Sequence, residues 1–139
     1  MEYIDTNILI SLIDKNDNKH EMANGLIKKY NSTIITELNL IEMRSVLSRI
    51  ELQEEEVDAL IDYLFIKTDI KILDVDITKC LKKGEEIANS VKLKTLDCLH
   101  IANAIIVGAD KFITFDRDFK IKEEYIGKYG IEIINPLQG

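Results

Sequence analysis

The sequence predicts an α/β protein with three layers, α/β/α, in which helices cover both faces of a mostly parallel sheet of about four or five short strands. Short runs of β-branched and aromatic residues alternate with longer segments whose apolar residues recur at helical spacing. Parallel strands need crossover connections, and helices placed between strands supply them. The chain has 139 residues, one proline and no low-complexity tract, so one domain over residues 1–139 is expected.

Five elements are expected in the first part of the chain. They are a strand over residues 3–4, helices over 7–15 and 20–30, a strand over 33–35 and a helix over 36–50. The run 33–35 is short and entirely β-branched, which predicts a buried strand. Thr36 is expected to cap the helix that follows, with Leu40, Val46, Leu47 and Ile50 on its apolar face.

Six further elements are expected after residue 50. They are a helix over residues 54–65, a strand over 70–73, helices over 78–91 and 95–107, and strands over 112–114 and 131–134. Thr95 is expected to cap the strongly apolar helix 95–107, and Gly108 is expected to end it. The acids at 54–58 stand where a helix begins, a position that the helix dipole favours.

The composition indicates a globular protein that does not enter a membrane. Hydrophobic residues make up 46% of the chain and charged residues 31%, and no apolar stretch approaches the length of a membrane span. The N-terminus lacks the basic and apolar regions of a signal peptide, so a cytoplasmic protein with Cys80 and Cys98 as reduced thiols is expected. The formal net charge of −7 is unusual for a protein that binds polyphosphates, because such proteins carry basic surfaces.

Four acidic residues are expected to meet at one edge of the sheet. Asp5 follows the first strand, and Asp116 follows Thr114 at the end of another. Glu42 lies in the second turn of its helix, and Asp97 lies in the first turn of the helix that begins near residue 95. Because sites in open parallel sheets form beyond the carboxyl ends of the strands, these four side chains can converge there.

Each acid also has an ordinary structural explanation. Asp5 can cap a helix, Asp97 can interact with a helix dipole, and Asp116 can form a turn. Glu42 can lie on a solvated face, paired with a neighbouring arginine. Asp5 and Asp97, however, are flanked by apolar residues, and an ionised carboxylate in such surroundings needs a partner.

A divalent cation is a suitable partner for gathered carboxylates. Such groups repel one another and raise one another's pKa until a cation neutralises them. Ligands that are all oxygen, without organised cysteine or histidine, favour Mg²⁺ or Mn²⁺ over Zn²⁺. One or two ions are both compatible with the sequence, and each can lower the pKa of a bound water and stabilise charge on a phosphoryl oxygen.

Four segments resemble the motifs of PIN-domain ribonucleases, the fold of VapC-type toxins. Residues 3–9, YIDTNIL, resemble the opening signature of the family. Residues 36–42 (TELNLIE), 95–102 (TLDCLHIA) and 113–119 (ITFDRDF) are similar to its second, third and fourth motifs. The order and spacing of the four motifs cover nearly the whole chain.

The resemblance implies roles for eight residues. Its acidic residues, which would hold Mg²⁺ or Mn²⁺ and carry catalysis, are Asp5, Glu42, Asp97 and Asp116. Its substrate- or water-orienting positions correspond to Thr6, Asn7, Thr114 and Asp118. Asp118 is also an alternative to Asp116 as the fourth acid, because both lie in the fourth motif.

The resemblance implies a metal-dependent endoribonuclease that hydrolyses RNA with a metal-activated water. Members of the family are often homodimers, and VapC-type members are inhibited by a small antitoxin protein. The alternative from another class is a non-catalytic PIN-like module that binds RNA or a protein. His100 is expected to be a packed structural histidine, and the cationic residues near the expected site, which are either phosphate contacts or solvated charges, are Arg44, Arg117, Lys92 and Lys94.

Overall fold

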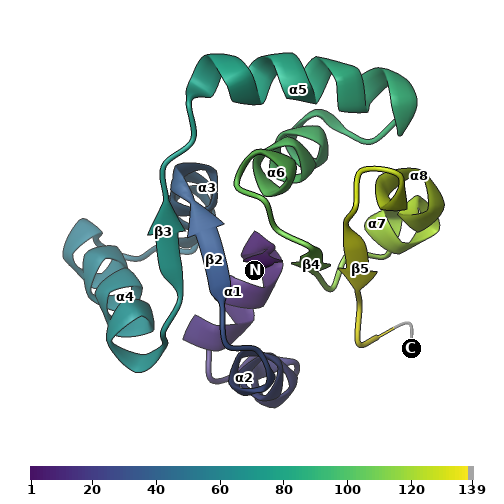
Figure 1. The fold of residues 1–139 in the computed structure, drawn as a ribbon. Coiled ribbons are helices and arrows are strands. Elements are labelled where there is room, and N and C mark those ends of the chain that lie inside the picture. The colour runs from purple at the N-terminus through teal and green to yellow at the C-terminus, as the bar shows by residue number, and fades with distance from the viewer. Residues whose placement is uncertain (138–139) are drawn as a thin grey trace.

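A five-stranded parallel sheet lies at the centre of the computed structural model, which describes residues 1–137 (Figure 1). The strands are β1 (Glu2–Ile4), β2 (Thr33–Thr36), β3 (Lys71–Leu73), β4 (Lys111–Ile113) and β5 (Glu132–Ile134). Their order is β3-β2-β1-β4-β5, and every neighbouring pair is parallel. The predicted sheet is therefore confirmed.

Eight helices connect and follow these strands in the described residues. They are α1 (Thr6–Ile13), α2 (His20–Lys29), α3 (Glu37–Ser48), α4 (Glu54–Lys67), α5 (Ile77–Ser90), α6 (Thr95–Ile106), α7 (Arg117–Ile121) and α8 (Glu123–Gly127). The first six were predicted from their periodicity. The last two were not, because a helix of five residues is too short to show a repeat of apolar positions.

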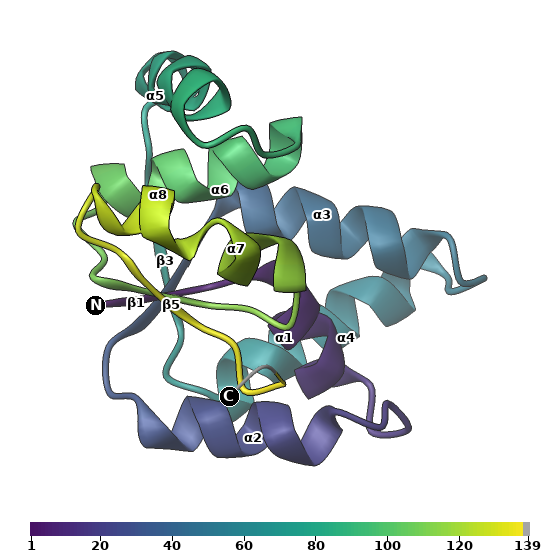
Figure 2. The same cartoon turned by 90° about the vertical axis from the view of Figure 1, so that its right-hand side faces the viewer.

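Two hydrophobic clusters, one on each face of the sheet, produce the three layers. Alternate residues of a strand point to opposite faces. Tyr3, Ile34 and Phe112 belong to a cluster with residues of α5, α6, α7 and α8, whereas Ile4, Ile35 and Ile113 pack with α1, α2, α3 and α4. Figure 2 shows α5, α6, α7 and α8 above the strands and α1 and α2 below them. This arrangement confirms the α/β/α prediction.

Two details of the predicted helices are wrong. Lys94, not Thr95, is the N-cap of α6, because its extended backbone (φ −65°, ψ 159°) makes Thr95 the first helical residue. Ile50 is 60% exposed rather than on the apolar face of α3, because that helix ends at Ser48. Gly108, with φ of +79°, follows the end of α6 as predicted.

The strand order creates a crevice beside β1. From β1 the chain moves outward to β2 and β3, then crosses to the other side of β1 to form β4 and β5. The connections after β1 and β4 therefore leave the sheet in different directions at neighbouring carboxyl ends, which is where sheets of this kind bind ligands. Asp5 and Thr114 are the residues that directly follow these two strands.

The remaining expectations from composition concern the thiols and the membrane. Cys80 and Cys98 are buried and free. No helix within residues 1–137 combines the length and the apolar composition that crossing a bilayer requires.

Candidate functional site

Asp5 lies between β1 and α1 and is the first of the acidic residues that form the candidate site. It is the N-cap of α1, and its Oδ1 accepts a hydrogen bond of 2.8 Å from the Thr6 amide. Its Oδ2 accepts a hydrogen bond of 2.7 Å from the Thr114 hydroxyl. Asp5 is only 7% exposed, and this burial raises the pKa of its carboxyl group, as does the negative charge of Glu42. Asp5 therefore caps a helix and is also the buried member of the acidic site.

Three further carboxylates, those of Asp97, Asp116 and Asp118, lie near Asp5. Asp97 stands in the first turn of α6, and Asp116 is the N-cap of α7, accepting a 2.9 Å hydrogen bond from the Asp118 amide. One carboxylate oxygen from each of Asp97, Asp116 and Asp118 lies within 4.8 Å of the others. Burial raises the pKa of Asp97 to about 6, and the charges of Asp116 and Asp5 contribute further. The two candidates for the fourth acid thus lie in one group with Asp97.

The raised pKa of Asp97 predicts a change of stability with pH. Folded Asp97 holds a proton up to about pH 6, whereas in the unfolded chain it releases it near its ordinary value of 3.8. The folded state then binds more protons, so the contribution of this group to the free energy of unfolding is greatest below about pH 4 and is lost as the pH rises through 6. With a chelator present, urea unfolding from pH 4 to 7 should show Asp97→Asn gaining stability relative to wild type over this window. A difference that stays constant with pH would contradict the prediction.

Glu42 approaches the same site from α3. Its Oε1 accepts a hydrogen bond of 2.9 Å from the Thr6 hydroxyl and contacts Nε2 of His100. Burial would raise the pKa of Glu42, but the hydrogen bonds from His100 and Thr6 favour the carboxylate, and the pKa is lowered. Glu42 is therefore held as a carboxylate, although it is not a member of the Asp97–Asp116–Asp118 group.

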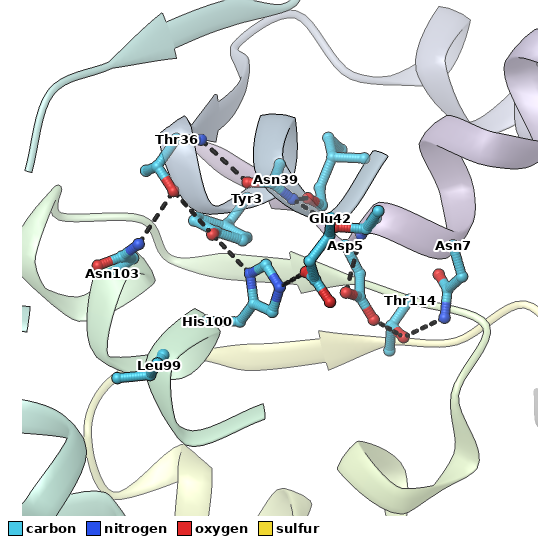
Figure 3. A network of polar contacts seen from close by, with 12 residues as sticks. Tyr3, Asp5, Asn7, Thr36, Asn39, Glu42, Leu99, His100, Asn103 and Thr114 are labelled. Atoms are coloured by element: carbon cyan, nitrogen blue, oxygen red, sulfur yellow. Dashed lines mark hydrogen bonds and ion pairs between the residues drawn. The ribbon is translucent and has the colours of Figure 1, made fainter. Parts of the chain in front are cut away.

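The Thr114 hydroxyl joins the two neighbouring strand ends. Besides donating to Asp5, it accepts hydrogen bonds from the Asp116 amide at 2.9 Å and from Nδ2 of Asn7 at 3.4 Å. Oδ1 of Asn7 accepts a hydrogen bond from the Phe115 amide at 3.2 Å. Figure 3 shows Asn7, Thr114 and Asp5 in one chain of polar contacts. These bonds fix the position of Asp116 relative to Asp5.

The contacts of two residues of the site were not predicted from the sequence. Asn39 is fully buried, and its Nδ2 donates to the Ile4 carbonyl at 2.9 Å and to Thr6 Oγ1 at 3.1 Å. His100 is packed, as predicted, but its contact with Glu42 was not predicted. Its position three residues after Asp97 on one helix was the available signal, since such residues are neighbours on a helix surface.

The acids open into a cavity of about 380 Å³ at the edge of the sheet. Its lining includes Asp5, Glu42, Asp97 and Asp116, together with Lys19 from the segment before α2. Among the predicted orienting residues, Thr6 and Asn7 line it as well. The four sequence-predicted acids, which come from four different segments, are therefore brought together.

The donor set of the site fits a hard divalent cation. The ligand atoms offered by Asp97, Asp116 and Asp118 are carboxylate oxygens, which Mg²⁺ and Mn²⁺ prefer. Burial is the main cause of the raised pKa of Asp97, and the negative charges of Asp116, Asp5 and Asp118 add to it. A bound cation would relieve this repulsion, so the residues present fit such an ion.

Comparison with known proteins identifies the fold and then the family. No curated protein sequence gives a significant match. Among solved structures, VapBC2 from Rickettsia felis bound to a promoter DNA fragment has a TM-score of 0.70 at 22% identity, covering 97% of this chain and 98% of that chain. A toxin-antitoxin complex from Klebsiella pneumoniae has a TM-score of 0.66 at 19% identity, covering 94% and 95%.

A third similar structure is VapC20 of Mycobacterium tuberculosis, described as a sarcin-ricin loop cleaving toxin. Its TM-score is 0.69 at 17% identity, covering 87% of this chain and 94% of that chain. At these identities the likenesses show a shared fold. The family model described as PIN domain matches residues 3–124, a range that contains Asp5, Glu42, Asp97, Asp116 and Asp118. The chain therefore belongs to the PIN domain family.

Proposed function

We propose that this protein is an endoribonuclease that uses Mg²⁺ or Mn²⁺ to hydrolyse RNA phosphodiester bonds. The observation that carries the proposal is the Asp97–Asp116–Asp118 group, whose carboxylate oxygens lie within 4.8 Å of one another next to the buried Asp5. Membership of the PIN domain family and the fold shared with VapC20 support it. A bound cation would neutralise the repulsion that these acids exert on one another.

The residues of the site have distinct tasks in this reaction. Asp97, Asp116 and Asp118 would hold the cation, and Asp5 and Glu42, which line the same cavity as Asp97 and Asp116, would offer further carboxylate oxygens. When bound, the ion supplies Lewis acidity toward water and toward the phosphoryl oxygens. The oxygen of water attacks phosphorus, the bond from phosphorus to the leaving oxygen breaks, and the leaving oxygen takes a proton. Because water rather than a side chain attacks phosphorus in this proposal, no covalent enzyme intermediate forms.

The purified protein provides the direct test. It should cut single-stranded RNA when Mg²⁺ or Mn²⁺ is present, and EDTA should stop the reaction. Sequencing the fragments would then define the bases at the cleaved bond. Cleavage that continues in EDTA would count against a metal-dependent nuclease.

A basic surface beside the acids is expected to contact the RNA backbone. Lys92, Lys94 and Lys122 surround a hollow that also includes Asp97 and Asp118. None of these lysines forms an ion pair with an acidic side chain in residues 1–137. This local positive charge can offset the overall negative charge of the chain for a phosphate ligand. Of the four cationic residues considered from the sequence, Lys92 and Lys94 thus lie next to the acids, whereas Arg44 pairs with Asp58 at 2.7 Å.

Replacing Lys94 with glutamine should weaken RNA binding without altering the metal site. For each phosphate of a single strand that the protein no longer neutralises, the slope of log binding constant against log salt should fall by roughly 0.7. The measurement is the KM or the RNA dissociation constant between about 50 and 200 mM salt, conditions typical of such titrations. Lys82→Gln on α5, which lies outside this hollow, is the matched control. Equal slopes for both variants would show that Lys94 does not neutralise a phosphate.

We further propose that the protein is the toxin of a VapBC-type pair, acts in the cytoplasm and forms a homodimer. The support is the fold shared with proteins described as VapBC2 and as a toxin-antitoxin complex. Co-purification with the product of the adjacent gene, and loss of RNA cleavage in that complex, would be the expected results. Light scattering of the protein alone reports its oligomeric state.

A further inference from the structure

We propose that His100 and Tyr3 are positioning residues: neutral His100 donates a hydrogen bond from Nε2 to Oε1 of Glu42, so that Oε2 is the Glu42 oxygen that would be offered to a cation. The cation side of this inference rests on the proposed function. Which ring nitrogen of His100 carries the proton does not depend on the proposed function.

The geometry places the imidazole of His100 between Tyr3 and Glu42 (Figure 3). Nδ1 lies 2.8 Å from the Tyr3 hydroxyl oxygen, and Nε2 contacts Oε1 of Glu42. His100 is 1% exposed and Tyr3 is fully buried, so water does not compete for either ring nitrogen. The rings of Tyr3 and His100 also meet edge to face, with centroids 5.7 Å apart. Both nitrogens therefore have one fixed partner.

The hydrogen bonds around these residues have one consistent direction. Nδ2 of Asn103 donates to Thr36 Oγ1 at 2.9 Å. In one of the two directions that these distances allow, the Thr36 hydroxyl donates to the Tyr3 oxygen at 3.2 Å and the Tyr3 hydroxyl donates to Nδ1 of His100. The proton of the neutral imidazole is then on Nε2, where it is donated to Glu42. In this arrangement each hydroxyl and imidazole proton has an acceptor, and the chain ends on a carboxylate.

The opposite direction leaves a donor without a partner. If Nδ1 of His100 carried a proton toward Tyr3, the Tyr3 hydroxyl would donate to Thr36, which already accepts from Asn103. The Thr36 hydroxyl proton would then lack an acceptor unless the Asn103 amide turned over. That turn would put an N–H donor where Oδ1 of Asn103 now has no partner, and buried N–H groups are orphaned more rarely than carbonyl oxygens. The structure therefore favours the Nε2–H tautomer.

This tautomer determines what Glu42 can offer the cavity. Its Oε1 receives both the Thr6 hydroxyl and the His100 N–H, whereas Oε2 accepts no hydrogen bond within residues 1–137. In Figure 3 the second Glu42 oxygen lies on the side of Asp5. A long flexible side chain is thus held by one oxygen while the other remains available, which lowers the entropy lost when it binds an ion.

Nitrogen-15 NMR of the imidazole tests the tautomer without any metal or RNA. Wild type should show a protonated Nε2 and an unprotonated, hydrogen-bonded Nδ1 for His100. A protonated Nδ1, in either the other neutral tautomer or the imidazolium, would overturn the inference. This measurement holds even if the protein cleaves no RNA.

Mn²⁺ titration tests the positioning role. Loss of an outer hydrogen-bond partner of a metal ligand typically costs about 10- to 100-fold in affinity or activity, so His100→Leu should weaken Mn²⁺ binding and lower kcat by such a factor, with the KM for RNA little changed. His100→Gln, which keeps an N–H donor, should recover part of the affinity. His20→Gln, which changes the other buried histidine, should bind Mn²⁺ as wild type does.

Three results would overturn the positioning role. They are a folded His100→Leu variant with wild-type Mn²⁺ affinity, a His100→Gln variant that is folded but no better than His100→Leu, and a wild type that binds no Mn²⁺. If His100→Leu does not fold, Tyr3→Phe and His100→Gln decide the matter, since both should retain an N–H donor toward Glu42 and bind Mn²⁺ less tightly than wild type. Wild type that binds Mn²⁺ but cuts no RNA would refute the proposed nuclease alone.

Discussion

Asp97→Asn is expected to reduce RNA cleavage by about a hundredfold to a thousandfold at a given Mn²⁺ concentration. A cation stabilises the charge of a phosphoryl transition state by several kcal/mol, and each 1.36 kcal/mol corresponds to a factor of about ten in rate. Asp97 contributes one of the three oxygens that lie within 4.8 Å, and asparagine has the same shape without the charge. The loss should appear mainly in kcat and in the Mn²⁺ dependence of the rate.

The fold is not expected to suffer from this replacement. Because Asp97 is repelled by Asp116 and Asp5, its amide should leave the metal-free protein as stable as wild type or slightly more stable. Mn²⁺ should raise the melting temperature of wild type more than that of the variant. Glu55→Gln removes an acid from the first turn of α4, outside the cavity, and is the matched control. If Asp97→Asn cleaves RNA as fast as Glu55→Gln does, the proposed nuclease function is wrong.

The positions of the acids were predictable because local rules place them. Asp5 and Asp116 each follow a strand that a short apolar run identifies, and parallel strands put their carboxyl ends at one edge. Glu42 and Asp97 follow from helix starts that are predictable to within one residue. Their convergence then depended only on a parallel sheet with these strands adjacent, as β1 and β4 are.

The contacts of the site were less predictable because they depend on strand order. Tyr3 and His100, which contact each other, are 97 residues apart in the sequence. His100 and Glu42, which also contact each other, are 58 residues apart. No periodicity in the sequence indicates that residues so far apart will meet. Their spacing also does not predict how α3 and α6 lie beside each other. Asn39 is similar, because a polar residue near a helix start suggests only capping, which it also performs for the Thr36 amide. Direct contacts between distant elements are what the structure adds.

The part of the fold that escaped prediction has a related cause. Helices α7 and α8 have five residues each, and α7 begins where Asp116 caps it. Buried Phe119 and Ile126 anchor these turns to the face of the sheet that α6 covers. Tertiary packing rather than local periodicity therefore sustains them. One consequence is that Asp118, on α7, owes its position to the core beneath it.

Phe112→Ala is expected to destabilise the protein by about 3–5 kcal/mol, the usual cost of removing a buried phenylalanine side chain. Phe112 is fully buried on β4, and its ring stacks on Tyr3 with centroids 5.3 Å apart. Its ring also packs on that of Phe119 on α7, with centroids 4.6 Å apart. The side chain thus supports both the tyrosine that contacts His100 and the helix that carries Asp118.

Urea unfolding in the presence of a chelator measures this effect apart from metal binding. Phe112→Leu leaves a smaller cavity and should fall between wild type and Phe112→Ala, which keeps the comparison usable if the alanine variant does not fold. Ile66→Ala, at a side chain that is 84% exposed on α4, should change the free energy of unfolding by less than about 0.5 kcal/mol. In Phe112→Leu the Mn²⁺ affinity should also fall, because α7 and Tyr3 then pack against a smaller side chain. If stability falls and Mn²⁺ affinity does not, then the acids keep their positions without this core residue, and the support assigned to Phe112 is wrong.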